Sequence, residues 1–178
     1  MVNVLTEGSL VHDGFQETQG RTADLVLSTV QSALSSTGFT RVLCTGHSLG
    51  AAVATLDATM LKMHLPSTVE VDSVMFGLPR VGNQEFADMI DNLVCHLAQA
   101  VLPCEDTNLL LTVQLPDFTH VTNQNDPVPN VPPRFLSFQH PQGEIHITTV
   151  GTNGDATMES CPGQENEVCC CRDIPVCS

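Results

Sequence analysis

The feature that most constrains the fold is the pentapeptide Gly-His-Ser-Leu-Gly at residues 46–50, which has the pattern Gly-x-Ser-x-Gly. A short apolar run at residues 41–45 leads directly into it and predicts a buried strand. An alanine-rich run at residues 49–65 leads out of it and predicts a mostly buried helix that ends at Pro66. The pattern alone would match many chains by chance, but a strand before it and a helix after it make the match specific. Together they predict an α/β fold that displays Ser48 on a sharp strand-to-helix turn.

Such a turn has the chemistry that a serine nucleophile needs. Gly46 and Gly50 are expected to allow the neighbouring backbone to approach closely. The helix that follows directs its free N–H groups and its positive dipole end toward Ser48. We expect the backbone N–H of Leu49 to donate a hydrogen bond to an oxyanion. The alternative, a Gly-Ser turn without chemistry, is disfavoured by both flanking elements.

A serine hydroxyl becomes a good nucleophile only when a base takes its proton and an acid orients that base. In this fold the three groups follow in the order Ser, Asp or Glu, His. Asp126 comes just after the predicted strand 118–122, and sites form at the carboxyl ends of such strands. We therefore predict Asp126 as the acid. Asp117 and Asp155 are weaker candidates because neither follows the end of a predicted strand so closely.

Helices and strands are expected to alternate along the rest of the chain. Apolar residues at three- and four-residue steps predict a helix from Ala23 to Leu34, which Gly38 stops. Further strands are expected at 69–76, 118–122 and 144–150, and a helix at 86–97. This alternation predicts a mainly parallel sheet with helices on both faces. The 178 residues fit a single domain, in which residues 94–117 read as an insertion.

The charge balance excludes one class of partner. Six basic and twenty acidic residues give a net charge of −14. Such a surface repels phosphate backbones, so we expect no nucleic-acid partner, and it suits a neutral substrate. The apolar runs are too short for a transmembrane segment.

The cysteines indicate an oxidising compartment. Five of the eight lie in residues 161–178, which read as a disulfide-stapled tail. A metal cluster is the alternative, but no histidine lies among these five, and three of them are consecutive. We therefore expect no metal. Residues 1–10 have neither the basic nor the apolar region of a signal peptide.

Several motifs together resemble the fungal class 3 lipase family. They are Gly46–Gly50, Phe-Gly-Leu-Pro-Arg-Val-Gly-Asn at 76–83, Asp-Pro-Val-Pro at 126–129, Pro-Pro at 132–133 and Phe-Gln-His-Pro at 138–141. The resemblance runs from Val11 to about Leu93, resumes at Phe118 and fades after Cys161. It implies an α/β-hydrolase fold and a secreted parent protein. It also implies hydrolysis of carboxylic esters, chiefly acylglycerols at a lipid–water interface, without a cofactor, and we expect a monomer.

By this resemblance Ser48 is the nucleophile and Asp126 the triad acid. The family also carries a small disulfide loop at the position where Pro-Gly-Gln-Glu-Asn follows Cys161. The resemblance, with that turn-rich segment, implies that Cys161 pairs with Cys169, or failing that with Cys170.

The departures from the family imply a chain truncated at both ends. The oxyanion strand with its second donor, and the lid, precede the Val-His-x-Gly-Phe block, which begins here at Val11, so both are expected upstream of residue 1. The catalytic histidine is expected beyond residue 178. His140 and His146 match positions that the family uses structurally, so neither is expected to replace it.

Two functions from different classes follow. The first is a serine lipase or esterase that forms an acyl-enzyme on Ser48, with a feruloyl esterase as an alternative within this class. The second is a catalytically dead fragment or lipid-binding pseudoenzyme that lacks the triad histidine.

Overall fold

A five-stranded sheet forms the centre of the molecule. The computed structural model describes residues 8–98 and 118–165. The strands stand in the order β1 (Arg41–His47), β2 (Glu70–Phe76), β4 (Phe118–Asn123), β6 (Glu144–Val150) and β7 (Ala156–Cys161). The first four are parallel, and β7 pairs with β6 in the antiparallel direction. The predicted, mainly parallel sheet is therefore confirmed.

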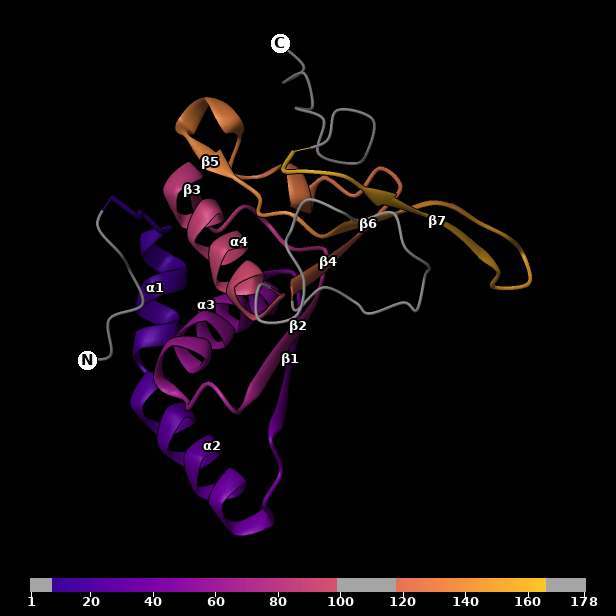
Figure 1. The fold of residues 1–178 in the computed structure, drawn as a ribbon. Coiled ribbons are helices and arrows are strands. Elements are labelled where there is room, and N and C mark those ends of the chain that lie inside the picture. Colours follow the sequence, from indigo (N-terminus) through magenta and orange to yellow (C-terminus); the bar gives the residue numbers. More distant parts are fainter. Residues whose placement is uncertain (1–7, 99–117, 166–178) are drawn as a thin grey trace.

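The helices pack against the first strands of this sheet. They are α1 (Asp13–Gly20), α2 (Ala23–Thr37), α3 (Leu49–His64) and α4 (Gln84–Ala98). Helix α3 contacts both β1 and β2, and α1 and α2 pack against α3 in turn. Figure 1 shows all four helices gathered on one side of β1 and β2. Two clusters of buried apolar side chains fill this layer, one centred on Leu56, Met75 and Phe86 and the other on Met60 and Leu61.

One expectation about the sheet differs from the structure. Strand β1 was predicted to be buried with helices on both faces, yet its residues alternate between exposed and half-buried. Val42 and Cys44 pack toward α3, whereas Leu43 on the opposite face is 62% exposed. Within the described residues, the helices therefore cover only one face of β1. An apolar, β-branched run does not distinguish a strand buried on one face from a strand buried on both.

The other predicted elements are present at or near their expected bounds. Helix α2 begins at Ala23 as predicted and ends at Thr37. The next residue, Gly38, has a left-handed φ of 73°, and its N–H donates to the Leu34 carbonyl at 2.9 Å. Helix α3 ends at His64, just before Pro66. The predicted insertion at 94–117 overlaps α4, which continues to Ala98, and residues 99–117 lie outside the described part of the chain.

Several short elements have no clear sequence signal. They are helix α1, the antiparallel pair β3 (Gly82–Asn83) and β5 (Phe138–Gln139), strand β7, and two single-turn 3₁₀ helices, η1 (Val128–Asn130) and η2 (Arg134–Leu136). Both 3₁₀ helices lie in the connection from β4 to β5. No helix in the described ranges is long and apolar enough to cross a membrane.

Candidate active site

Ser48 occupies the turn between β1 and α3 in a strained backbone conformation. Its φ of 55° and ψ of −128° lie where side-chain-bearing residues are rarely found. The Ser48 N–H donates to the Phe76 carbonyl of the neighbouring strand at 2.9 Å. Its carbonyl accepts from Ala51 at 2.9 Å, which begins the hydrogen bonding of α3. Strain of this kind persists only where the surroundings enforce it, and it is typical of functional positions.

The two glycines of the pentapeptide have different roles. A Cβ on Gly46 would stand 2.6 Å from the Gly50 carbonyl oxygen and 2.8 Å from Ala51 Cα. A Cβ on Gly50 would meet nothing within 4 Å. The expected close approach of backbone is therefore confirmed at Gly46 but is wrong at Gly50, because only the strand side of the turn faces another backbone segment.

The Leu49 N–H lies where an oxyanion donor is needed. Leu49 is the first residue of α3, so its N–H has no acceptor within the helix. The positive end of the helix dipole lies at the same point, beside Ser48. Its role as an oxyanion donor stays a prediction.

Asp126 lies at the carboxyl edge of the sheet, as predicted. Its N–H donates to the carbonyl of Asn123, the last residue of β4, at 3.0 Å. Its Oδ1 accepts from the N–H of Val128, the first residue of η1, at 3.0 Å. The weaker candidates differ: Asp155 lies in the β6–β7 turn, and Asp117 is outside the described residues.

Gly77, which belongs to the motif at 76–83 but was given no role in the site, links Asp126 to the serine turn. It directly follows β2, and its N–H donates to the Val121 carbonyl of β4 at 2.8 Å. A Cβ on Gly77 would stand 3.2 Å from Asp126 Oδ2 and 3.7 Å from His47 Nε2. The Asp126 carboxylate and the His47 ring of the serine turn therefore both approach the position where a side chain at residue 77 would lie. A glycine that closes a predicted strand beside the serine strand is the signal that could have identified it.

The two histidines considered as substitute bases are engaged elsewhere. His140 is 1% exposed, its Nε2 donates to the Pro129 carbonyl at 2.9 Å, and its ring stacks on His120 with a centroid distance of 4.9 Å. Burial, more than any other cause, lowers the pKa of His140 to about 4. His146 Nδ1 lies 2.9 Å from the Thr122 hydroxyl. Among residues 8–93 and 118–165, no side chain hydrogen-bonds to the Ser48 hydroxyl.

A buried ion pair lies beside residues 126–132, the stretch from Asp126 onward that we call the acid segment. Arg80 and Glu165 join through two hydrogen bonds of 2.7 and 2.9 Å. Their side chains are 0% and 1% exposed. The sequence offers no signal for this pair, because the two residues stand 85 positions apart.

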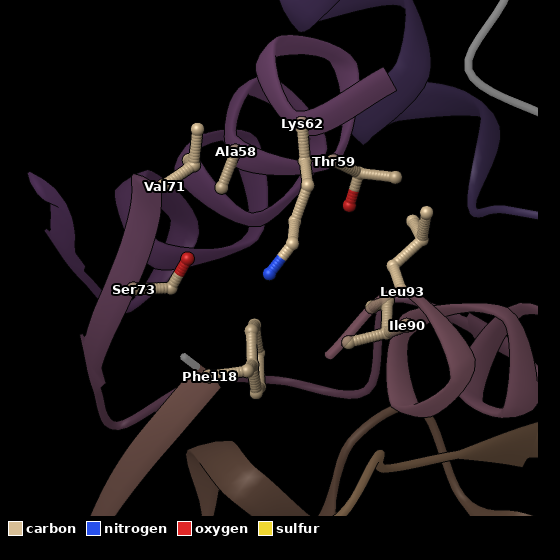
Figure 2. A pocket seen from close by; sticks show the side chains of 8 residues that line it. All are labelled: Ala58, Thr59, Lys62, Val71, Ser73, Ile90, Leu93 and Phe118. Atoms are coloured by element: carbon tan, nitrogen blue, oxygen red, sulfur yellow. The ribbon is translucent and has the colours of Figure 1, made fainter. Parts of the chain in front are cut away.

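A small pocket of about 20 Å³ lies away from this chemistry. Val71 and Ser73 near the start of β2, Phe118 at the start of β4, and Lys62 of α3 are among the residues that line it. Figure 2 shows the Lys62 ammonium pointing into it. These strands are parallel to β1, so the pocket lies toward the amino ends of the strands, whereas Ser48 follows a carboxyl end. We therefore do not regard it as the substrate site.

The cysteine tail lies mostly outside the described residues. Cys161, at the end of β7, is 3% exposed and is disulfide-bonded. Cys169 and Cys170 are not described, so the predicted pairing stays a prediction. Within the described ranges, no group of three or more His, Cys, Asp or Glu side chains is placed to hold a metal ion.

Comparisons with known proteins agree with this geometry. Residues 1–136 match the model of the family described as Lipase (class 3). The secreted mono- and diacylglycerol lipase MDL5 of Malassezia globosa is 33% identical over 160 residues, which cover 90% of this chain and 44% of that protein.

Two solved structures share the fold. The Lip2 lipase of Yarrowia lipolytica is 27% identical with a TM-score of 0.75, and the match covers 95% of this chain and 54% of that one. A triacylglycerol lipase whose catalytic centre is formed by a serine protease triad is also 27% identical, with a TM-score of 0.72 and coverage of 97% and 57%. The chain thus spans about half the length of the proteins that it matches. With the Gly-x-Ser-x-Gly turn between β1 and α3, and a family match over residues 1–136, the chain belongs to the class 3 lipase family.

Proposed function

We propose that the protein is a serine carboxylic ester hydrolase that acts on acylglycerols. Ser48 is the nucleophile, Asp126 the triad acid, and the Leu49 N–H one donor to the oxyanion. The observation that carries the proposal is the strained backbone of Ser48 at the junction of β1 and α3. A structural serine has no need of such a conformation, whereas a nucleophile gains from being displayed at the start of a helix.

The reaction follows from these positions. The Ser48 Oγ attacks the ester carbonyl while an imidazole takes the hydroxyl proton, and the carbonyl oxygen becomes an oxyanion beside the Leu49 N–H. The tetrahedral intermediate collapses, the alkoxide leaves with the proton from the imidazole, and an acyl-enzyme remains on Ser48. Water then releases the acid by the same steps. Asp126 orients the imidazole and stabilises its charged form.

The mechanism also needs a base, and the two histidines considered for this role are bonded to other residues. His140 is buried against Pro129, and His146 is bonded to Thr122. We propose that neither acts as the base, and that the base, the second oxyanion donor and the lid come from outside the described residues.

The relatives support the substrate class and the location. MDL5 is named a secreted mono- and diacylglycerol lipase, and the disulfide at Cys161 fits an oxidising compartment. We therefore propose that the whole protein is secreted and acts as a monomer at a lipid–water interface. The net charge of −14 supports a neutral ester and argues against nucleic acid. A feruloyl ester is the alternative substrate within the same chemistry.

A second function is favoured by one observation. Because no described side chain hydrogen-bonds to the Ser48 hydroxyl, a chain that binds lipid without hydrolysing it is the competing candidate. Loss of a triad base leaves only about 10³–10⁴-fold acceleration over water. The two candidates therefore differ by orders of magnitude in turnover.

The experiment measures turnover of a short-chain p-nitrophenyl ester by the purified whole protein, its Ser48→Ala variant and a matched Ser35→Ala variant on the exposed face of α2. A fluorophosphonate probe should label wild type and Ser35→Ala but not Ser48→Ala, because only an activated serine reacts. Labelling at another serine would remove the proposed nucleophile. Absence of both Ser48 labelling and turnover would favour the lipid-binding candidate.

A further inference from the structure

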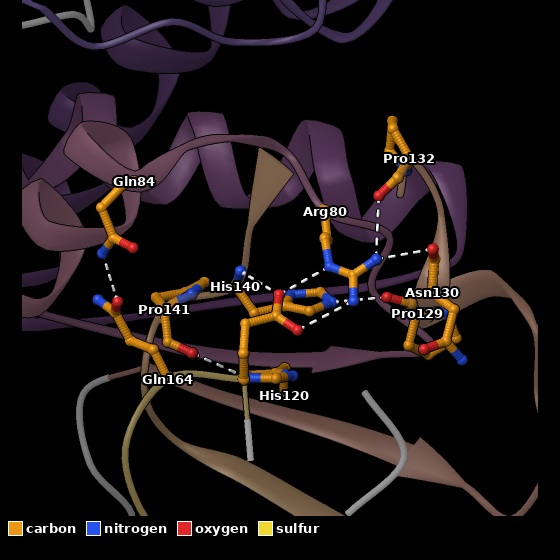
Figure 3. Close-up of polar contacts among 10 residues, drawn as sticks. Arg80, Gln84, His120, Pro129, Asn130, Pro132, His140, Pro141 and Gln164 are labelled. Carbon is orange, nitrogen blue, oxygen red and sulfur yellow. Dashed lines mark hydrogen bonds and ion pairs between the residues drawn. The ribbon is translucent and has the colours of Figure 1, made fainter. Parts of the chain in front are cut away.

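The charged groups of Arg80 and Glu165 are fully enclosed. Arg80 Nε donates to Glu165 Oε1 at 2.7 Å, and Arg80 Nη2 donates to Oε2 at 2.9 Å. A bidentate pair of this geometry fixes the direction of both side chains, and water does not compete with it. Figure 3 shows the Arg80 guanidinium directed between the segment that holds Asn130 and the ring of His140.

From this fixed position Arg80 holds the segment that follows the acid. Its Nη1 donates to the carbonyls of Asn130 at 2.7 Å and Pro132 at 3.0 Å. Its backbone N–H donates to the Val131 carbonyl between them at 3.0 Å. Three consecutive carbonyls are therefore held by one arginine. Asn130 is the last residue of η1, and the first residue of that turn, Val128, donates its N–H to the Asp126 carboxylate.

Glu165 reaches the same segment by a second route. Its Oε1 also accepts from the His140 N–H at 2.8 Å, and the His140 ring donates to the Pro129 carbonyl at 2.9 Å. One carboxylate thus supports η1 through Arg80 on one side and through His140 on the other. Asp126 is bonded to Val128 at the start of that turn, so both routes reach the segment that follows the acid.

The backbone at Glu165 shows that this contact is enforced. Its φ of 49° is left-handed, which a residue with a long side chain rarely adopts. The preceding residue fastens the segment to α4, since Gln164 Nε2 donates to Asp88 at 3.0 Å and to Asp91 at 2.5 Å. The chain therefore adopts an unfavourable conformation that places the Glu165 carboxylate beneath the acid segment.

We infer that Glu165, acting through Arg80 and His140, is a positioning residue that sets the place of the Asp126 carboxylate. Glu165 itself touches no reacting atom. The inference rests on the proposed role of Asp126, and it assigns a catalytic purpose to the segment that follows β7.

The test uses three variants of the whole protein. Glu165→Gln removes the charge and keeps the shape. The paired Arg80→Met, Glu165→Leu variant removes both charges together, which buried ion pairs often tolerate without loss of stability. Leu61→Ala, in the core cluster between α2 and α3, is the control that weakens the fold without touching the acid segment.

The first measurement does not depend on catalysis. Hydrogen exchange of the Val128 N–H reports the bond to Asp126 directly. We expect this amide to exchange roughly tenfold faster in Glu165→Gln and in the paired variant, and at the wild-type rate in Leu61→Ala. If Glu165→Gln fails to fold, the paired variant decides. Unchanged Val128 exchange in every variant that folds would overturn the inference.

The second measurement follows Ser48-dependent ester hydrolysis. We expect kcat to fall roughly 10–100-fold in Glu165→Gln with KM unchanged, because a displaced acid affects the reaction and not substrate binding. In an Asp126→Asn background the same substitution should cause no further loss, whereas a purely structural role would lower turnover in both backgrounds. Absence of any Ser48-dependent turnover in wild type would count against the proposed function, and the exchange measurement would still decide the inference.

Discussion

Gly77 lies directly against the carboxylate of Asp126, so that a Cβ at residue 77 would stand 3.2 Å from Oδ2. The contact joins the end of β2 to Asp126, which follows β4, at the edge of the sheet where Ser48 precedes α3. Gly77 also has a left-handed φ of 54°. Two separate constraints, backbone conformation and close contact, therefore require glycine here.

We expect Gly77→Ala to lower stability by roughly 1–2 kcal/mol through backbone strain and also to displace the Asp126 carboxylate. The matched control is Gly38→Ala, because Gly38 has a φ of 73° but open space around its Cα. Both variants should melt at lower temperature, but only Gly77→Ala should lose more Ser48-dependent turnover than its fraction unfolded explains. Equal turnover in the two variants would mean that the contact with Asp126 has no effect on catalysis.

The two motif glycines should respond in opposite directions. Gly46→Ala brings a Cβ within 2.6 Å of backbone that has no room to shift, so we expect a loss of roughly 1–3 kcal/mol. Gly50→Ala places a methyl group in open space within α3, where alanine favours the helix by about 1 kcal/mol over glycine. Urea unfolding of both variants measures the difference. A loss of stability in Gly50→Ala would contradict it.

Release of strain gives a prediction at the nucleophile. Ser48→Gly removes a strain of about 1–3 kcal/mol and lowers stability by at most about 1 kcal/mol through added freedom of the unfolded chain. We therefore expect a net gain of about 1 kcal/mol, or roughly 2–4 °C in Tm, together with complete loss of fluorophosphonate labelling. Ser35→Gly, in the regular helix α2, should instead lose roughly 0.5 kcal/mol. Ser48→Gly variants that melt below wild type would show that the turn is not strained.

How far the sequence predicts the site depends on how local each signal is. The turn at Ser48 was predicted because the strand and the helix that define it are its immediate neighbours in the chain. The place of Asp126 was predicted because the end of a strand and its following turn are also local. The contact between Arg80 and Glu165 was not predicted. It forms only when β7 pairs antiparallel with β6, and no periodic pattern in the sequence indicates that pairing. The exposed face of β1 at Leu43 was not predicted for a similar reason, because the burial of a strand face depends on which elements pack against it.

Two buried imidazoles predict how stability responds to acid. His120 and His140 stack at 4.9 Å, and burial lowers the pKa of each to about 4 from an ordinary value of 6.5. Between these values the unfolded chain binds protons that the folded chain does not, so stability is complete above pH 6.5 and is lost as the pH falls toward 4. The slope for two such groups is at most about 2.7 kcal/mol per pH unit. Burial raises the pKa of Asp57 and Asp91, which acts in the opposite direction in the more acidic range, so the measurement belongs between pH 5 and 6.5.

Urea unfolding at several pH values in this interval measures that slope. Replacing one imidazole, in His120→Gln, should reduce it by about half. Leu61→Ala should lower stability at every pH and leave the slope unchanged. A slope that persists in full after His120→Gln would assign the acid sensitivity to other groups.

The disulfide at Cys161 lies close in sequence to Glu165. Cys161 is disulfide-bonded at the end of β7, and Glu165 lies only four residues further along the chain. If the partner is Cys169, the bridge closes a short loop around Glu165 and limits the freedom of that carboxylate in the unfolded chain. Closing a loop of this size stabilises by roughly 2–3 kcal/mol. Cleavage after Glu165 or Glu167 should therefore give two peptides that stay joined until reduction.

The choice of partner is tested by single substitutions. Cys169→Ser should release the joined peptides and lower stability by the same roughly 2–3 kcal/mol as Cys161→Ser. Cys170→Ser should keep both the bridge and the stability if Cys169 is the partner, and the two results exchange if Cys170 is. Loss of the bridge should also speed exchange of the Val128 N–H, because the loop then holds Glu165 beneath the acid segment less firmly. A bridge from Cys161 to any other cysteine would refute both pairings, because neither short loop would then exist around Glu165.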